Sequence, residues 1–88
     1  MFRIWAKLFK DTRMIKDLTV EDFTEDTRTH KVFNSIDKIC GEFDLGKPIW
    51  LDKNIVEFKR FSRTRFNSDN FIEAIDFDYL EIHVIDED

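Results

Sequence analysis

The sequence TRTHKVFNSIDKICGEFD, residues 27–44, sets the architecture of this chain. Its apolar residues recur at spacings of one, three, three, one and three, which gather on one stripe of an α-helix. Thr24 or Thr27 can cap its start, and Gly46 in the left-handed conformation, followed by Pro48, can end it. We therefore predict an amphipathic helix over residues 27–44. The buried stripe is expected to contain Val32, Phe33, Ile36, Ile39, Cys40 and Phe43.

The segment before this helix has the period of two that is typical of strands. A polar turn at Asp11-Thr12-Arg13 separates residues 2–9 from residues 14–20, so the two segments predict a β-hairpin. In the second segment Lys16 interrupts the apolar side formed by Met14, Leu18 and Val20. In the first segment Phe2, Ile4, Ala6 and Leu8 alternate with Arg3, Trp5, Lys7 and Phe9.

Three further elements follow the first helix. A second helix is predicted over residues 52–62, with Asp52 as its N-cap. Ser68-Asp69 begins a third, shorter helical turn, and Tyr79–Ile85 alternates as a strand. The apolar face of the second helix is expected to consist of Leu51, Ile55 and Phe58, with Phe61 beside it. In the short turn, Phe71, Ile72 and Ile75 are expected to face one way.

These elements predict a single α+β domain over residues 1–88 with two layers. One layer is a three-stranded, mostly antiparallel sheet made of the hairpin and the C-terminal strand, with the first strand in the centre. The other layer is two to three helices on one face of that sheet, in the order ββααα(short)β, because strands and helices are segregated along the chain.

Composition restricts the function classes. The chain has 88 residues, of which 42% are hydrophobic, and its net charge is −5. Its single cysteine, Cys40, cannot form an internal disulfide, which favours a cytoplasmic setting. Residues 1–16 show neither a signal peptide nor a membrane span. Charge is segregated: residues 1–16 and 59–65 are basic, whereas residues 17–26 and 73–88 are acidic. Such blocks indicate either opposite segments that pair in the fold or separate patches that face partners.

No residue pattern predicts catalysis. Cys40 lies on the buried stripe of the first helix, where thiols usually serve packing. A nucleophilic Cys40–His pair is the less favoured alternative, because His30 lies near the helix N-terminus and His83 on the outward face of a strand. Asp76 and Asp78 resemble a carboxylate pair of a cation site, but no second cluster supplies the remaining ligands. The sequence therefore leans away from an enzyme, and we expect no cofactor and no metal, with a cation at Asp76 and Asp78 left open.

Several short segments resemble a family of short bacterial proteins of the Firmicutes type that has no known function. They are GKPIWLD (residues 46–52), TRF (64–66), DNFIE (69–73), DFDYLEI (76–82) and THKVF (29–33). The resemblance spans nearly the whole chain. It implies a cytoplasmic bacterial protein, and it brings no activity, ligand or site residue.

Two surfaces could meet a partner. If helices cover one sheet face only, the other face presents Trp5, Phe9, Tyr79 and Ile85 among charged side chains, which is typical of a protein-binding patch. We expect a non-enzymatic interaction or regulatory module that binds another protein or itself, as a homodimer. The alternative is a nucleic-acid-associated regulator that uses the basic and aromatic segment 58–66. Its bases are Lys59, Arg60, Arg63 and Arg65.

Membrane binding is a third alternative, which we do not favour. It would require residues 2–13 to form a basic amphipathic helix. Such a helix would gather Phe2, Trp5, Leu8 and Phe9 against Arg3, Lys7, Lys10 and Arg13. The strict alternation of residues 2–9 fits a strand better than a helix.

Overall fold

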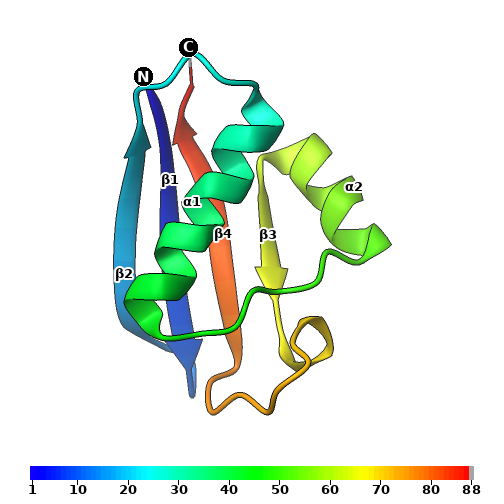
Figure 1. Cartoon of the computed structure of the whole chain (residues 1–88). Coiled ribbons are helices and arrows are strands. Elements are labelled where there is room, and N and C mark those ends of the chain that lie inside the picture. The colour runs from blue at the N-terminus through cyan, green and yellow to red at the C-terminus, as the bar shows by residue number, and fades with distance from the viewer. Residues whose placement is uncertain (88) are drawn as a thin grey trace.

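Two helices cover one face of a four-stranded sheet, whose order is β2-β1-β4-β3 and whose neighbouring strands are all antiparallel (Figure 1). The structure is a computed structural model and describes residues 1–87. It confirms the α+β class, the antiparallel sheet and the central position of the first strand. The elements are β1 (Phe2–Lys10), β2 (Arg13–Asp22), α1 (Arg28–Phe43), α2 (Asp52–Phe61), β3 (Arg63–Phe66), the 3-10 turn η1 (Ser68–Asn70) and β4 (Tyr79–Asp86).

The core lies between the sheet and the helices. The apolar side of β1 is buried, and Ile4 of this strand and Ile39 of α1 are both fully inaccessible to solvent. The predicted helix stripe is confirmed except at Phe33, which is 47% exposed. Because residues 2–10 are extended and Phe2 and Leu8 are buried, the alternative of an amphipathic membrane helix at the N-terminus is wrong.

The β1–β2 hairpin closes through a two-residue turn. Asp11 and Thr12 both have positive φ, 52° and 65°, which is the geometry of a type I′ turn and matches the twist of the flanking strands. A bulge then shifts the register, so that Lys16 pairs with Leu8 and Met14 pairs with Phe9. The prediction that Met14 shares a face with Leu18 and Val20 is therefore wrong, because the bulge turns the start of β2 over.

The fourth strand is the main difference from the predicted sheet. Residues 63–66 form β3, a short strand that pairs with β4 at the edge of the sheet. Four residues give too few alternations to distinguish a strand from a loop, so the predicted three-stranded sheet lacks this edge. Within β3, Thr64 and Phe66 are buried while Arg63 and Arg65 are exposed.

The helix ends also differ in detail. Asp44, with φ 55°, takes the left-handed position after α1, so the prediction of a left-handed Gly46 is wrong. The N-cap of α2 is Leu51 and not Asp52, since Leu51 is still extended (φ −90°, ψ 164°) and the helix begins at Asp52. The side chain of Asn54 accepts a hydrogen bond from the Leu51 N–H at 3.1 Å. The predicted third helix is only one 3-10 turn, η1.

The apolar faces predicted for the second helix and the short turn are also partly wrong. On α2, Phe58 is buried, whereas Ile55 and Phe61 are 40% and 54% exposed. After η1, Phe71 and Ile75 pack against the core, but Ile72 is 89% exposed. These ring and aliphatic side chains at the surface leave part of the helical layer apolar and open to solvent.

A buried polar network joins α2 to the two loops beside it. The Nδ2 of Asn54 donates to Thr64 Oγ1 at 2.8 Å and to the Arg65 carbonyl at 2.9 Å. The Nδ2 of Asn70 donates to Asn54 Oδ1 at 2.8 Å and to the Ile49 carbonyl at 2.7 Å. Because both amide side chains are fully buried, these bonds fix the paths of residues 49–51 and 67–70.

Candidate functional site

Within residues 1–87, no helix lies on the face of the sheet opposite α1 and α2 (Figure 1). The strand register arranges its side chains in rows that cross all the strands. One row consists of Asp17, Lys7, Glu81 and Arg65, from β2, β1, β4 and β3 respectively. We call this set the charged row.

The charged row alternates in sign across the sheet, from acid to base to acid to base. Lys7 Nζ lies 3.0 Å from Glu81 Oε2, and Arg65 Nε lies 3.1 Å from Glu81 Oε1. Glu81 is only 8% exposed although no helix covers it, because its two cationic neighbours cover it. The pairing supports the alternative in which the N-terminal basic block meets the C-terminal acidic block.

Aromatic rings flank the charged row on both sides. On one side Trp5 donates its indole N–H to Asp17 Oδ2 at 3.0 Å, and Lys7 Nζ lies 3.9 Å from its ring centroid. On the other side Phe9 and Tyr79 stack with centroids 4.9 Å apart, and Arg65 lies 4.5 Å from the Tyr79 ring. All three rings are partly exposed, so the open face is a ring-and-charge surface.

Burial and neighbouring charges shift the pKa values of two groups on the open face, Glu81 and His83. Burial alone would raise the pKa of Glu81, but the hydrogen bonds from Lys7 and Arg65 outweigh burial and hold the pKa below its ordinary value. Burial lowers the pKa of His83, and the nearby charges of Lys7 and Arg63 lower it further. At neutral pH, Glu81 is therefore charged and His83 neutral.

Of the four residues predicted to bind a partner, the structure brings Trp5, Phe9 and Tyr79 onto the open face. Ile85 departs from the predicted alternation, because a register shift in the β1–β4 pairing places Asp86, and not Ile85, opposite Arg3. Ile85 remains 41% exposed. The sequence pattern missed the contributions of Asp17 and Arg65, because only the register of the neighbouring strands reveals them.

The four bases of the nucleic-acid alternative are divided between the two layers. Lys59 and Arg60 are exposed on α2, whereas Arg63 and Arg65 lie on the open face of the sheet, opposite His83 and Glu81. Arg65 is already paired with Glu81. The basic segment 58–66 therefore presents its charges in two directions, since it spans the end of one helix and an edge strand.

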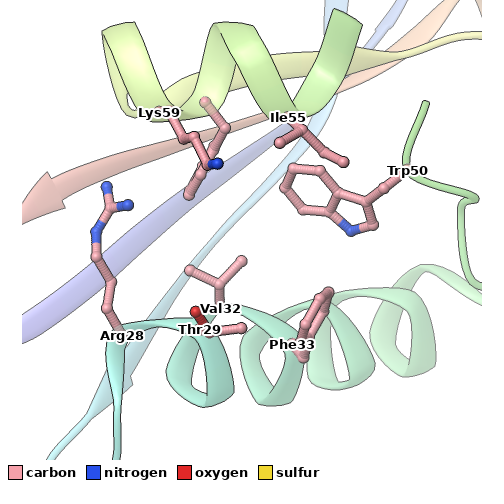
Figure 2. Close-up of a pocket in the computed structure, with 8 residues that line it drawn as sticks. Arg28, Thr29, Val32, Phe33, Trp50, Ile55 and Lys59 are labelled. Carbon is pink, nitrogen blue, oxygen red and sulfur yellow. The ribbon is translucent and has the colours of Figure 1, made fainter. Parts of the chain in front are cut away.

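A second candidate surface is a groove between α1 and α2, which the sequence analysis did not predict. Its cavity has a volume of about 280 Å³. Trp50 forms its aromatic wall, with edge-to-face contacts to Phe33, Phe58 and Phe66 at 6.1, 5.4 and 5.1 Å. Figure 2 shows Trp50 and Phe33 at one end of the groove and Arg28 and Lys59 toward the other. We call it the interhelical groove.

Residues considered for catalysis or metal binding have other surroundings or partners in the structure. Cys40 is buried, which raises the pKa of its thiol to about 11, and the neighbouring Asp37 adds to the effect. His30 pairs with Asp26 at 2.8 Å, and Asp78 Oδ2 accepts the backbone N–H of Asp11. Within residues 1–87, no three His, Cys, Asp or Glu side chains come together as metal ligands would.

No helix formed by residues 1–87 has the length and apolarity needed to cross a membrane. Comparison with known protein families, curated proteins and solved structures finds no match to this chain. The resemblance to a bacterial family therefore stays a prediction, and a function has to be argued from the geometry of the surfaces described above.

Proposed function

We propose that this chain is a non-enzymatic interaction module whose open sheet face binds a second copy of itself. The proposal is supported by one observation, the alternating sign of the charged row. A row that reads acid, base, acid, base in one direction reads base, acid, base, acid in the other. Such a row is complementary to its own reverse.

One two-fold arrangement uses this property. If two open faces pack together about an axis parallel to the strands, β2 of one copy lies opposite β3 of the other, and β1 lies opposite β4. Asp17 then faces Arg65 of the second copy, and Lys7 faces its Glu81. Stacked sheets pack roughly 10 Å apart and are rotated by about 30°, so the match is closest at the centre.

The same arrangement matches the flanking rows. Phe9 faces Tyr79 of the second copy, and Trp5 faces its His83, which is neutral at neutral pH. The other in-plane two-fold axis, perpendicular to the strands and passing through the charged row, would place Lys7 against Lys7 and Glu81 against Glu81. Since like charges in contact are unfavourable, the geometry favours the axis parallel to the strands.

The size of the face predicts a weak dimer. The strands β1, β2, β3 and β4 are 9, 10, 4 and 8 residues long, and at about 4.8 Å spacing and about 3.3 Å per residue they present roughly 500 Å² per copy, or roughly 1,000 Å² in total. This area lies below that of standard stable interfaces, and several of the charges are already paired within each copy. We therefore expect a dissociation constant in the micromolar range, with exchange between monomer and dimer.

A charge-swap experiment tests the proposal by sedimentation velocity over a concentration series. Asp17→Lys alone places a lysine against Arg65 of the other copy, so two cations meet. Arg65→Glu alone places a glutamate against Asp17 of the other copy, so two carboxylates meet. Each single variant should therefore be monomeric. An equimolar mixture of the two should dimerise again, because each variant then faces its opposite charge. Lys53→Glu, on the exposed surface of α2 and outside the charged row, is the matched control and should dimerise like the parent chain.

Two results would overturn the proposal. One is a parent chain that remains monomeric at about 1 mM, far above the expected dissociation constant. The other is a mixture of the two variants that associates no better than either variant alone. Circular dichroism of each variant shows whether loss of association reflects loss of the fold.

A further inference from the structure

The interhelical groove combines an apolar body with a basic end, at which Arg28 is paired with Glu87 and Lys59 is unpaired among the described residues. Its apolar wall comes from Val32 and Phe33 of α1, from Ile55 and Phe58 of α2, and from the loop residue Trp50. Phe33 and Ile55 remain 47% and 40% exposed, since the two helices do not close over the groove. A space of about 280 Å³ could hold roughly nine water molecules, or an organic chain of similar size.

The two charged side chains that line the groove, Arg28 and Lys59, are both basic. Arg28 is held in place, since its Nε donates to Glu87 at 2.7 Å and its Nη2 donates to Ser62 Oγ at 3.1 Å. Lys59 has no ion-pair partner in the described part of the chain. The ammonium group of Lys59 is therefore available to an anion.

We infer that the interhelical groove binds a small amphiphilic carboxylate, with its apolar chain against Trp50 and Phe33 and its carboxylate at Lys59 and Arg28. Apolar lining with a few placed polar groups is the usual makeup of a small-molecule site. A neutral apolar ligand would leave Lys59 unused. A multiply charged anion would place further charge against the aromatic wall, away from Lys59 and Arg28. One charged head on an apolar chain satisfies both ends.

The two tryptophans provide a direct test. A ¹⁵N–¹H spectrum contains one indole signal from Trp50 in the groove and one from Trp5 on the open sheet face, and Trp5→Phe assigns them. Titration with octanoate should shift the Trp50 signal in a saturable way, with a dissociation constant of about 1 mM or lower, and leave the Trp5 signal in place. Acetate, which has the head without the chain, should shift neither signal.

Variants separate the positive end from the apolar wall. Lys59→Gln should weaken octanoate binding about fivefold to tenfold, because it removes one charge-assisted contact. Lys53→Gln, on the same helix but outside the groove, should leave binding unchanged. On the parent chain, octanol should bind more weakly than octanoate. Octanol should bind Lys59→Gln about as tightly as it binds the parent chain.

Four outcomes would overturn the inference: no saturable shift of the Trp50 signal, equal shifts of both indole signals, equal effects of the two lysine variants, or binding of octanol as tight as that of octanoate. Because Trp5 reports on the open face and Trp50 on the groove, failure here leaves the proposed self-association untouched.

Discussion

The side-chain amide of Asn70 donates a hydrogen bond to the Oδ1 of Asn54 over 2.8 Å, and solvent reaches neither residue. Through this bond the loop after β3 is connected to the first turn of α2. Asn70 also holds Ile49, both through its side chain and through its carbonyl, which accepts the Ile49 N–H at 2.6 Å. Ile49 precedes Trp50, so the amide pair positions the aromatic wall of the interhelical groove.

We expect Asn54→Leu to lower the free energy of unfolding by about 3 kcal/mol, although leucine is close to asparagine in size. The variant leaves the N–H of Leu51, the Arg65 carbonyl and the amide of Asn70 buried without their partner, and each such loss costs roughly 1–3 kcal/mol with partial relaxation. Urea denaturation measures the change. Asn34→Leu, at an exposed position of α1, is the control and should change stability by less than about 0.5 kcal/mol.

The pH dependence of stability should contain a contribution from Glu81. The pKa of Glu81 in the folded chain is below its ordinary value of 4.5. The ionised carboxylate therefore stabilises the fold fully above about pH 5, and this stabilisation is lost as the pH falls through the pKa of the folded chain. At pH 7 we expect Glu81→Gln to be less stable than the parent chain by about 1–2 kcal/mol. This difference should shrink between pH 5 and pH 3, as measured by denaturation at each pH. A difference that stays constant across this range would contradict the assignment.

Cys40 should be inert toward thiol reagents in the folded chain. With its pKa raised to about 11, the thiolate fraction at pH 8 is roughly one in a thousand, and burial blocks access to the sulfur as well. Reaction with Ellman's reagent should proceed only through opening of the structure and become fast in denaturant. An Asn34→Cys variant in a Cys40→Ala background provides an exposed thiol for comparison. Equal rates for the two folded thiols would show that Cys40 is accessible.

The hairpin turn offers a stabilising substitution. Thr12 adopts a φ of 65°, which a threonine side chain disfavours and glycine adopts freely. Thr12→Gly converts the turn to Asp-Gly, a preferred pair for a type I′ turn, at the loss of an exposed hydrogen bond from Thr12 Oγ1 to the Asp11 carbonyl. We expect a gain of about 0.5–1 kcal/mol, read as a higher denaturation midpoint. A lower midpoint would mean that the hydroxyl contact matters more than the backbone strain.

Local pattern was sufficient for the larger elements. The spacing of apolar residues in 27–44 predicted α1 to within one residue at each end, because a helix with one buried side imposes its own period on the sequence. The alternation in residues 2–9 and 79–85 predicted β1 and β4 for the same reason. β3 was missed because its four residues carry too little pattern, and it is defined by its pairing with β4.

The surfaces proposed to act depend on information that no single segment carries. Alternation alone places Trp5, Phe9 and Tyr79 on the side of their strands away from the core, since it separates the two sides of a strand. The fold adds that Asp17 and Arg65 complete a row of alternating charge with Lys7 and Glu81, and that Trp50 contacts Phe33 at one end of the interhelical groove. Register and packing join residues far apart in the chain, whereas periodicity describes only neighbours.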